Sequence, residues 1–245
     1  MMIRGAILFA GLLVIWYLVV LVTGVPPYIL PTPIAVGVAL AGNLQSLSTH
    51  LLVTLIEIVC GIFLGTLLGV CSALLMSAFK PVKRWLLPVL VISQAIPVFA
   101  LAPILILWLG YGMGSKIAMA VLIIFFPVTG AFYDGLRRTN PQWIELARIM
   151  GAGSWTIIRQ IRIPAALPTL ASGIRIAATV APIGAVVGEW IGASQGLGYY
   201  MLHANARMQT DQMFAALFLL AISALALYYG IDGVLRRMIY WQEGK

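Results

Sequence analysis

Long stretches of this sequence carry no charged residue. No Asp, Glu, Lys or Arg occurs between Arg4 and Glu57, and none occurs between Trp85 and Ser115. Over the whole chain 9% of the residues are charged and 62% are hydrophobic, whereas about 25% of the residues of a soluble domain are charged. Crossing the hydrocarbon core of a bilayer takes roughly 20 consecutive apolar residues in a helix. The sequence therefore predicts an all-α integral membrane protein and argues against a water-soluble enzyme.

Charges and prolines divide the chain into six predicted membrane spans, which are residues 5–22, 51–78, 86–109, 117–133, 168–192 and 212–234. The first run is longer than the apolar core of a signal peptide, so we expect it to be a retained span. Four prolines interrupt residues 23–33 and prevent a continuous helix there. Residues 34–50 are mildly amphipathic and suit a helix at the membrane interface. We predict one transmembrane domain over residues 1–245.

Basic residues are unevenly shared between the two predicted faces of the membrane. With the N-terminus in the cytoplasm, two of them, Lys116 and Arg207, lie outside. Twelve lie inside: Arg4, Lys80, Lys83, Arg84, Arg137, Arg138, Arg148, Arg159, Arg162, Arg236, Arg237 and Lys245. Because cytoplasmic loops carry the excess of Lys and Arg, we predict both termini inside. The periplasmic segments are then 23–50, 110–116 and 193–211, and residues 134–167 form a long cytoplasmic loop.

Small residues recur every four positions in two of the predicted spans. Span two carries Gly61, Gly65 and Gly69, and span five carries a similar stripe from Gly184 to Gly192. Such stripes let helix backbones approach closely in lipid. They predict close packing within one subunit, or else an interface or pathway shared between subunits.

The long cytoplasmic loop predicts two short helices joined by a glycine turn. Asn140-Pro141 favours a helix start, because proline is tolerated at the first helical position. Gly151 and Gly153 break that helix, and Ser154 can cap a second one over about residues 155–162. Pro164 is expected to end the second helix. The loop also contains six apolar residues, too many for so small a unit to bury, and this predicts a docking surface for a soluble partner: Trp143, Ile144, Ala147, Trp155, Ile157 and Ile158.

The same loop resembles the cytoplasmic signature loop of ATP-binding-cassette (ABC) importer permeases. That signature is Glu-Ala-Ala, three residues, Gly, nine residues, Ile, one residue and Leu-Pro. This sequence has Glu145-Leu146-Ala147, Gly151, Ile161 and Ile163-Pro164 at the same spacings. It departs from the signature at Leu146 and Ile163, where one apolar residue replaces another. The six-span layout extends the resemblance to nearly the whole chain.

The resemblance implies a type I importer permease in the bacterial inner membrane. Two such subunits would form the pathway, each docking its loop on one of two ATPase subunits, and a periplasmic binding protein would deliver the solute. A second identical permease is expected. The residues that match the loop and imply ATPase coupling are Glu145, Ala147, Gly151, Ala152, Ser154, Trp155, Ile161 and Pro164. Glu145 is expected either to make a charge-assisted contact with a basic group of the ATPase or to stabilise the first turn of its own helix.

Nucleotide is expected on the partner and not on this chain. The sequence contains no Gly-x4-Gly-Lys-[Ser/Thr] run, and Gly110–Lys116 resembles a phosphate loop only superficially because no Ser or Thr follows its lysine. ATP and Mg²⁺ would therefore bind the ATPase subunits, with no cofactor and no metal on the permease.

Several motifs resemble one branch of these permeases, which serves taurine, alkanesulfonates, nitrate and the pyrimidine precursor of thiamine. They are Leu30-Pro31-Thr32-Pro33, Gln94-Ala95-Ile96-Pro97 and Gly188-Glu189-Trp190-Ile191-Gly192-Ala193-Ser194-Gln195-Gly196-Leu197-Gly198-Tyr199. The segments 181–184 and 203–207 look most like the pyrimidine-precursor members.

Polar residues within predicted spans are expected to face protein or a wet cavity. Gln94, Pro97, Glu189 and Glu57 are the candidates for the solute pathway, and two carboxylates there favour a neutral heteroaromatic over an anion. Alternatively, Glu57 pairs with Arg175 or lies near the headgroups, and Glu189 lies at the outer rim. Pro97, Pro103 and Pro182 are expected to kink their helices.

Two other functional classes fit the sequence less well. A secondary transporter that works without ATP would suit broken helices with intramembrane carboxylates, but it gives no reason for the signature loop. A membrane-embedded enzyme needs a cluster of catalytic or metal-binding side chains, whereas the two histidines, His50 and His203, are both predicted outside.

Overall fold

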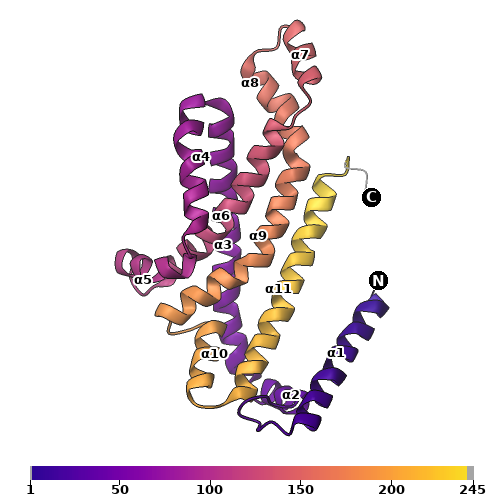
Figure 1. The fold of residues 1–245 in the computed structure, drawn as a ribbon, viewed down its shortest axis with the longest axis vertical. Coiled ribbons are helices and arrows are strands. Elements are labelled where there is room, and N and C mark those ends of the chain that lie inside the picture. Colours follow the sequence, from indigo (N-terminus) through magenta and orange to yellow (C-terminus); the bar gives the residue numbers. More distant parts are fainter. Residues whose placement is uncertain (1, 242–245) are drawn as a thin grey trace.

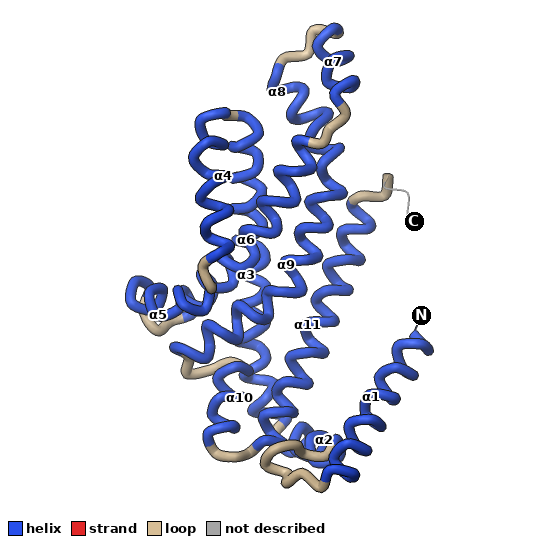
Figure 2. Tube along the Cα trace, viewed as in Figure 1, coloured by secondary structure: helices blue, strands red, loops and turns tan. Residues whose placement is uncertain are grey.

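The computed structural model describes residues 2–241, which form helices joined by short connections and, within that range, no strand (Figures 1 and 2). The helices are α1 Met2–Thr23, α2 Pro33–Gly42, α3 Leu44–Ala78, α4 Lys80–Ala95, α5 Val98–Leu109, α6 Met113–Arg137, α7 Pro141–Ile149, α8 Ser154–Ile157, α9 Ile163–Gly192, α10 Leu197–Ala206 and α11 Thr210–Met238. A π-helical turn, Ile158–Arg162, joins α8 to α9. The all-α prediction is confirmed for the described residues.

The long helices α3, α6, α9 and α11 form a bundle, with the α7–α8 hairpin projecting from one end and α2 and α10 at the other (Figure 1). Helix α1 stands beside this bundle. It is tied to α11 near the α2 end by two aromatic pairs, Trp16 with Phe214 and Phe9 with Phe218, whose ring centroids lie 5.7 and 5.9 Å apart.

Close helix packing around α6 explains both glycine stripes. A Cβ added at Gly61 or Gly65 of α3 would overlap Ala120 or Ile124 of α6, and one added at Gly184 of α9 would overlap the backbone of Ala120 from the other side. Because association of helices in lipid depends on such close approach, these glycines hold α3 and α9 against α6. Packing within one subunit is thus what the stripes do here.

Four helices are long and apolar enough to cross a membrane: α3, α6, the continuous α8–α9 helix and α11. The pair α4 and α5 passes the same test only together, and it is bent by 107°. The apolar part of α1 described with side chains, Ile7–Thr23, is shorter. The six-span layout therefore stays a prediction.

The predicted third span over residues 86–109 is not one continuous helix. It is two helices with a sharp break at Ile96 and Pro97. Pro97 has no N–H to continue the helix and pushes the preceding residue out of the helical region, and Ile96 is indeed extended, at φ −84° and ψ 123°. At Pro97 the expected kink is a complete break, with an angle of 107° between the two helices. Pro103 and Pro182, by contrast, lie inside continuous helices.

Pro164 does not end a helix, contrary to the sequence prediction. The chain stays helical from Ser154 to Gly192 and passes Pro164 in the first turn of α9. The wider π-helical turn just before it gives the reason, because a π turn rearranges the hydrogen-bond ladder where the proline N–H is missing. The backbone N–H of Ile163 donates to the carbonyl of Ile158 within that turn.

Candidate functional site

The α7–α8 hairpin begins and turns where the sequence predicts. The side chain of Asn140 caps α7 by accepting a hydrogen bond from the Gln142 N–H at 2.9 Å. The helix is closed by Gly151, which has φ +81°, and by the Ala152 N–H, which donates to the Ala147 carbonyl at 2.9 Å. A left-handed residue after a helix is the usual glycine role. The hairpin is thus a defined unit at the end of the bundle (Figure 2).

Five large apolar side chains of the hairpin are exposed. Ala147, Ile157 and Ile158 are buried, whereas Trp143 and Trp155 are exposed. The other exposed large apolar side chains here are Leu146, Ile149 and Met150. Of the six residues predicted to form a docking surface, only Trp143 and Trp155 are therefore exposed, and Leu146, Ile149 and Met150 complete the apolar face.

The eight predicted coupling residues divide between this exposed face and the root of the hairpin. Glu145, Gly151, Ser154 and Trp155 are exposed, Ala147 is buried, and Ala152 is half-buried. Ile161 and Pro164 line a groove of about 500 Å³ between α7 and the start of α9, which Trp241 also borders. Glu145 has no ion-pair partner among the described residues, so its carboxylate is free to meet a partner.

A buried polar cluster lies toward the opposite end of the bundle, where α3, α6, α9 and α10 meet. Glu57 of α3 is 0% exposed and lies 3.4 Å from the ammonium of Lys116 at the start of α6. The Glu189 carboxylate of α9 accepts a hydrogen bond from the Thr54 hydroxyl at 2.6 Å and others from the N–H groups of Gly198 and Tyr199.

Glu189 thereby caps the N-terminus of α10. A carboxylate satisfies the orphan N–H groups of a first helical turn and interacts favourably with the helix dipole. Thr54 also accepts a bond from the Leu197 N–H at 2.8 Å, and His50 Nδ1 accepts one from the Gly196 N–H at 3.0 Å. The cluster therefore fixes α10 onto α3 and α9.

Sequence reasoning missed the roles of Lys116, Thr54 and His50. Lys116 was expected at the outer surface, but α6 begins at Met113 and carries its side chain into the bundle. The available signal was that Lys116 and Glu57 are lone charges in apolar surroundings, which must pair if buried.

The four predicted pathway residues fall in two places. Gln94 and Pro97 are exposed at the break between α4 and α5, whereas Glu57 and Glu189 are buried within this one subunit. The alternative pairing of Glu57 with Arg175 is wrong, because Arg175 bonds Asp232 at 2.6 Å and Glu57 pairs with Lys116.

A family model described as "Binding-protein-dependent transport system inner membrane component" matches residues 61–239. A probable ABC transporter permease of Haemophilus influenzae is 56% identical and spans 94% of both chains. The formylaminopyrimidine transport permease ThiX of Halalkalibacterium halodurans is 40% identical over 96% of this chain and 94% of its own. The riboflavin transport permease RibX of Chloroflexus aurantiacus is 37% identical over 93% and 85%. Permeases named for aliphatic sulfonates and for taurine match at 29% identity.

The fold is also that of a solved ABC importer. The inward-facing MetNI methionine ABC transporter contains a chain that superposes with a TM-score of 0.70 at 21% identity, covering 80% of this chain and 97% of that one. Together with the family match and the apolar helices, this makes the protein a multi-pass inner membrane protein. The chain belongs to the family of binding-protein-dependent transport system inner membrane components, the permeases of ABC importers.

Proposed function

We propose that this chain is a six-span permease subunit that pairs with an identical copy to form the solute pathway of an ABC importer. Two separate ATPase subunits, which bind ATP and Mg²⁺, drive the pathway, and a periplasmic binding protein delivers the solute. One transmembrane domain spans residues 1–245, with both termini in the cytoplasm. Family membership supports the importer function, and the exposed apolar hairpin is the single observation that carries the coupling mechanism.

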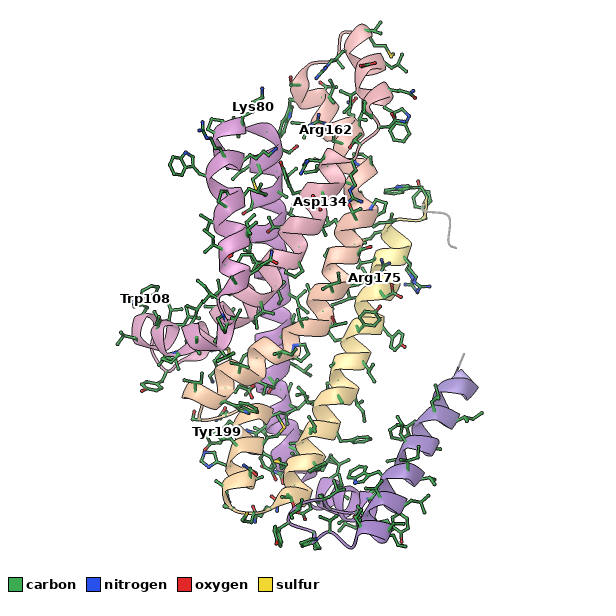
Figure 3. All side chains as sticks on the ribbon, in the orientation of Figure 1. Lys80, Trp108, Asp134, Arg162, Arg175 and Tyr199 are labelled. Carbon is green, nitrogen blue, oxygen red and sulfur yellow. The ribbon has the colours of Figure 1, made fainter. Side chains whose placement is uncertain are left out.

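The distribution of basic residues supports the cytoplasmic assignment of the hairpin. Figure 3 shows Lys80 and Arg162 at the hairpin end of the bundle and Tyr199 at the other. Since cytoplasmic segments carry the excess of Lys and Arg, residues 134–167 face the cytoplasm. The connections 23–50, 110–116 and 193–211 then face the periplasm.

The hairpin transmits force because it is stiff where it joins the membrane helix. From Ser154 the chain is helical without interruption through α9 to Gly192, so a displacement of the docked hairpin is passed directly to a helix at the centre of the bundle. Trp143, Leu146 and Trp155 supply apolar contact area for the ATPase, and the exposed Glu145 supplies a charge-assisted bond.

The transported solute is proposed to be a small nitrogen heteroaromatic such as a pyrimidine precursor of thiamine. The support comes from the relatives named for formylaminopyrimidine and riboflavin, which are 40% and 37% identical, against 29% for those named for sulfonates and taurine. The buried positions of Glu57 and Glu189 weaken the argument from pathway carboxylates. A sulfonate, taurine or nitrate permease is the alternative within the branch.

Uptake by the reconstituted importer tests this function. The permease is co-expressed with its ATPase and binding protein, placed in liposomes containing ATP, and offered labelled formylaminopyrimidine or labelled taurine. We expect ATP-dependent uptake of the pyrimidine and little uptake of taurine. Taurine uptake alone would establish the alternative, and uptake of either compound by the permease without ATPase subunits would contradict the importer mechanism.

A further inference from the structure

An aromatic cleft of about 360 Å³ opens at the end of the bundle opposite the hairpin. It lies between the connection that precedes α6, the last turn of α9 and α10. Rings from all three line it: Tyr111, Trp190, Tyr199 and His203. Tyr199 and His203 contact each other on α10 with their ring centroids 4.2 Å apart. Tyr111 and Trp190 are 77% and 51% exposed, so their ring surfaces are available to a ligand.

The base of this cleft is rigid. Glu189, which is among its lining residues, is 1% exposed and is held by Thr54 and by the N–H groups of α10. Trp190 follows it directly in the chain, and Tyr199 donates its own N–H to the same carboxylate. The two aromatic walls are therefore positioned by one buried carboxylate, which favours a preorganised site.

The polar character of the cleft selects among ligands. The carbonyls of the last helical turn lack intrahelical partners. Among the described residues, no backbone N–H outside the helix donates a hydrogen bond to the carbonyl of Trp190, Ile191 or Gly192. This end of α9 also carries the negative pole of the helix dipole. No Lys or Arg is among the residues that line the cleft. The site therefore suits a ligand that donates hydrogen bonds, and it offers nothing to balance the charge of a sulfonate or nitrate.

We propose that the Tyr111–Trp190–Tyr199–His203 cleft is the receiving site for the ring of a neutral, amino-substituted nitrogen heteroaromatic at the mouth of the pathway. The ring stacks on Trp190 or on the Tyr199–His203 pair, and its amino group faces the carbonyl end of α9. This inference rests on the proposed function and gives it a place in the structure.

Exposed aromatic residues also occur in membrane proteins as anchors at the lipid headgroups. Trp108 provides the matched control for that role, since it is 74% exposed on the neighbouring α5 and does not line the cleft. In Figure 3 it lies at the outer side of α5. A shared loss on replacing Trp108 and Trp190 would indicate anchoring, and a loss confined to Trp190 would indicate ligand contact.

The test uses the complete importer in liposomes with labelled formylaminopyrimidine as the probe. Replacing an aromatic ring stacked on a base by alanine costs about 1–3 kcal/mol, so we expect Trp190→Ala to lower the uptake rate roughly tenfold. Trp190→Phe should retain most of the rate, and Trp108→Ala should match the original protein. ATPase activity stimulated by the binding protein reports on assembly and should persist in all three variants.

The possible failures are distinguishable. Equal uptake by Trp190→Ala and Trp108→Ala overturns the cleft and leaves the proposed function standing. If Trp190→Ala fails to assemble, Tyr111→Ala on the exposed connection is measured instead. We expect its uptake rate to fall at least threefold, and an unchanged rate would contradict the cleft. Absence of probe uptake by the unaltered importer refutes the proposed solute and, with it, this site.

Discussion

Lys116 and Glu57 form an ion pair that almost no solvent reaches, with side chains 7% and 0% exposed. Burying a single charge in such a place is very costly, whereas a pair offsets much of that cost. Both residues sit beside the packed glycine faces, since Lys116 also contacts Gly188 of α9. The pair therefore joins α3 to α6 at the place where α9 packs against them.

Removing one member of this pair should be worse than removing both. We expect Lys116→Met alone, or Glu57→Gln alone, to destabilise the permease by about 3–5 kcal/mol if the remaining group stays charged. The double variant should recover a large part of that loss. Thermal unfolding of the purified permease in detergent measures the difference, and a double variant as unstable as the sum of the single ones would show that the two groups do not interact.

Local sequence chemistry predicted single-residue features well where they depend on neighbours in the chain. Asn140 caps α7 and Gly151 ends it, as their residue types indicate. The predicted cap at Ser154 is wrong, because Gly153 is the N-cap of α8 and no side chain caps that helix. The partners of Glu57 and Glu189 were not predictable in the same way, because Lys116, Thr54 and the start of α10 lie far along the sequence and meet the two carboxylates only through helix packing.

At the scale of elements, the turn of the hairpin depends on two glycines with different conformations. Gly151 has φ +81°, whereas Gly153 has φ −70° and is suited to any residue. A Cβ would meet no atom within 4 Å at either position. Substitution by alanine thus separates backbone strain from steric overlap.

Gly151→Ala should misplace α7 relative to α8, because a non-glycine residue in the left-handed region costs roughly 1–2 kcal/mol. We expect a several-fold loss of solute uptake per ATP hydrolysed, with normal amounts of assembled complex, while Gly153→Ala keeps the original ratio. Simultaneous measurement of uptake and ATPase activity in liposomes checks this. An unchanged ratio in Gly151→Ala would mean that the turn does not position the coupling surface.

The helical type of the elements followed from the spacing of charges and apolar runs, but the continuity of the helices did not. Apolar length alone cannot tell a kinked span from a broken pair, so the kink expected at Pro97 does not predict that the chain turns by 107° between α4 and α5. Residue types predict a helix end at Pro164, because the π-helical turn that accommodates this proline has no sequence signature of its own. In both cases the local backbone beside the proline, extended at Ile96 and π-helical before Pro164, decides what the proline does.

At the scale of the whole molecule, the hairpin and the aromatic cleft lie at opposite ends of one rigid path. The continuous helix from Ser154 to Gly192 has the hairpin at its start and the cleft at its end. A rotation of this helix driven by the ATPase would therefore change the cleft directly, as alternating access requires.

This arrangement requires the two ends of that helix to face opposite sides of the membrane, and cysteine labelling can test it. In a background with Cys60 and Cys71 replaced by alanine, we expect Ser154→Cys to react with an impermeant maleimide only in inverted vesicles. Ser194→Cys, just beyond the end of α9, should react in right-side-out vesicles. Both serines lie outside the buried core, so neither change should disturb folding. Reaction of both cysteines from the same side would contradict a helix that joins an inner coupling surface to an outer receiving site.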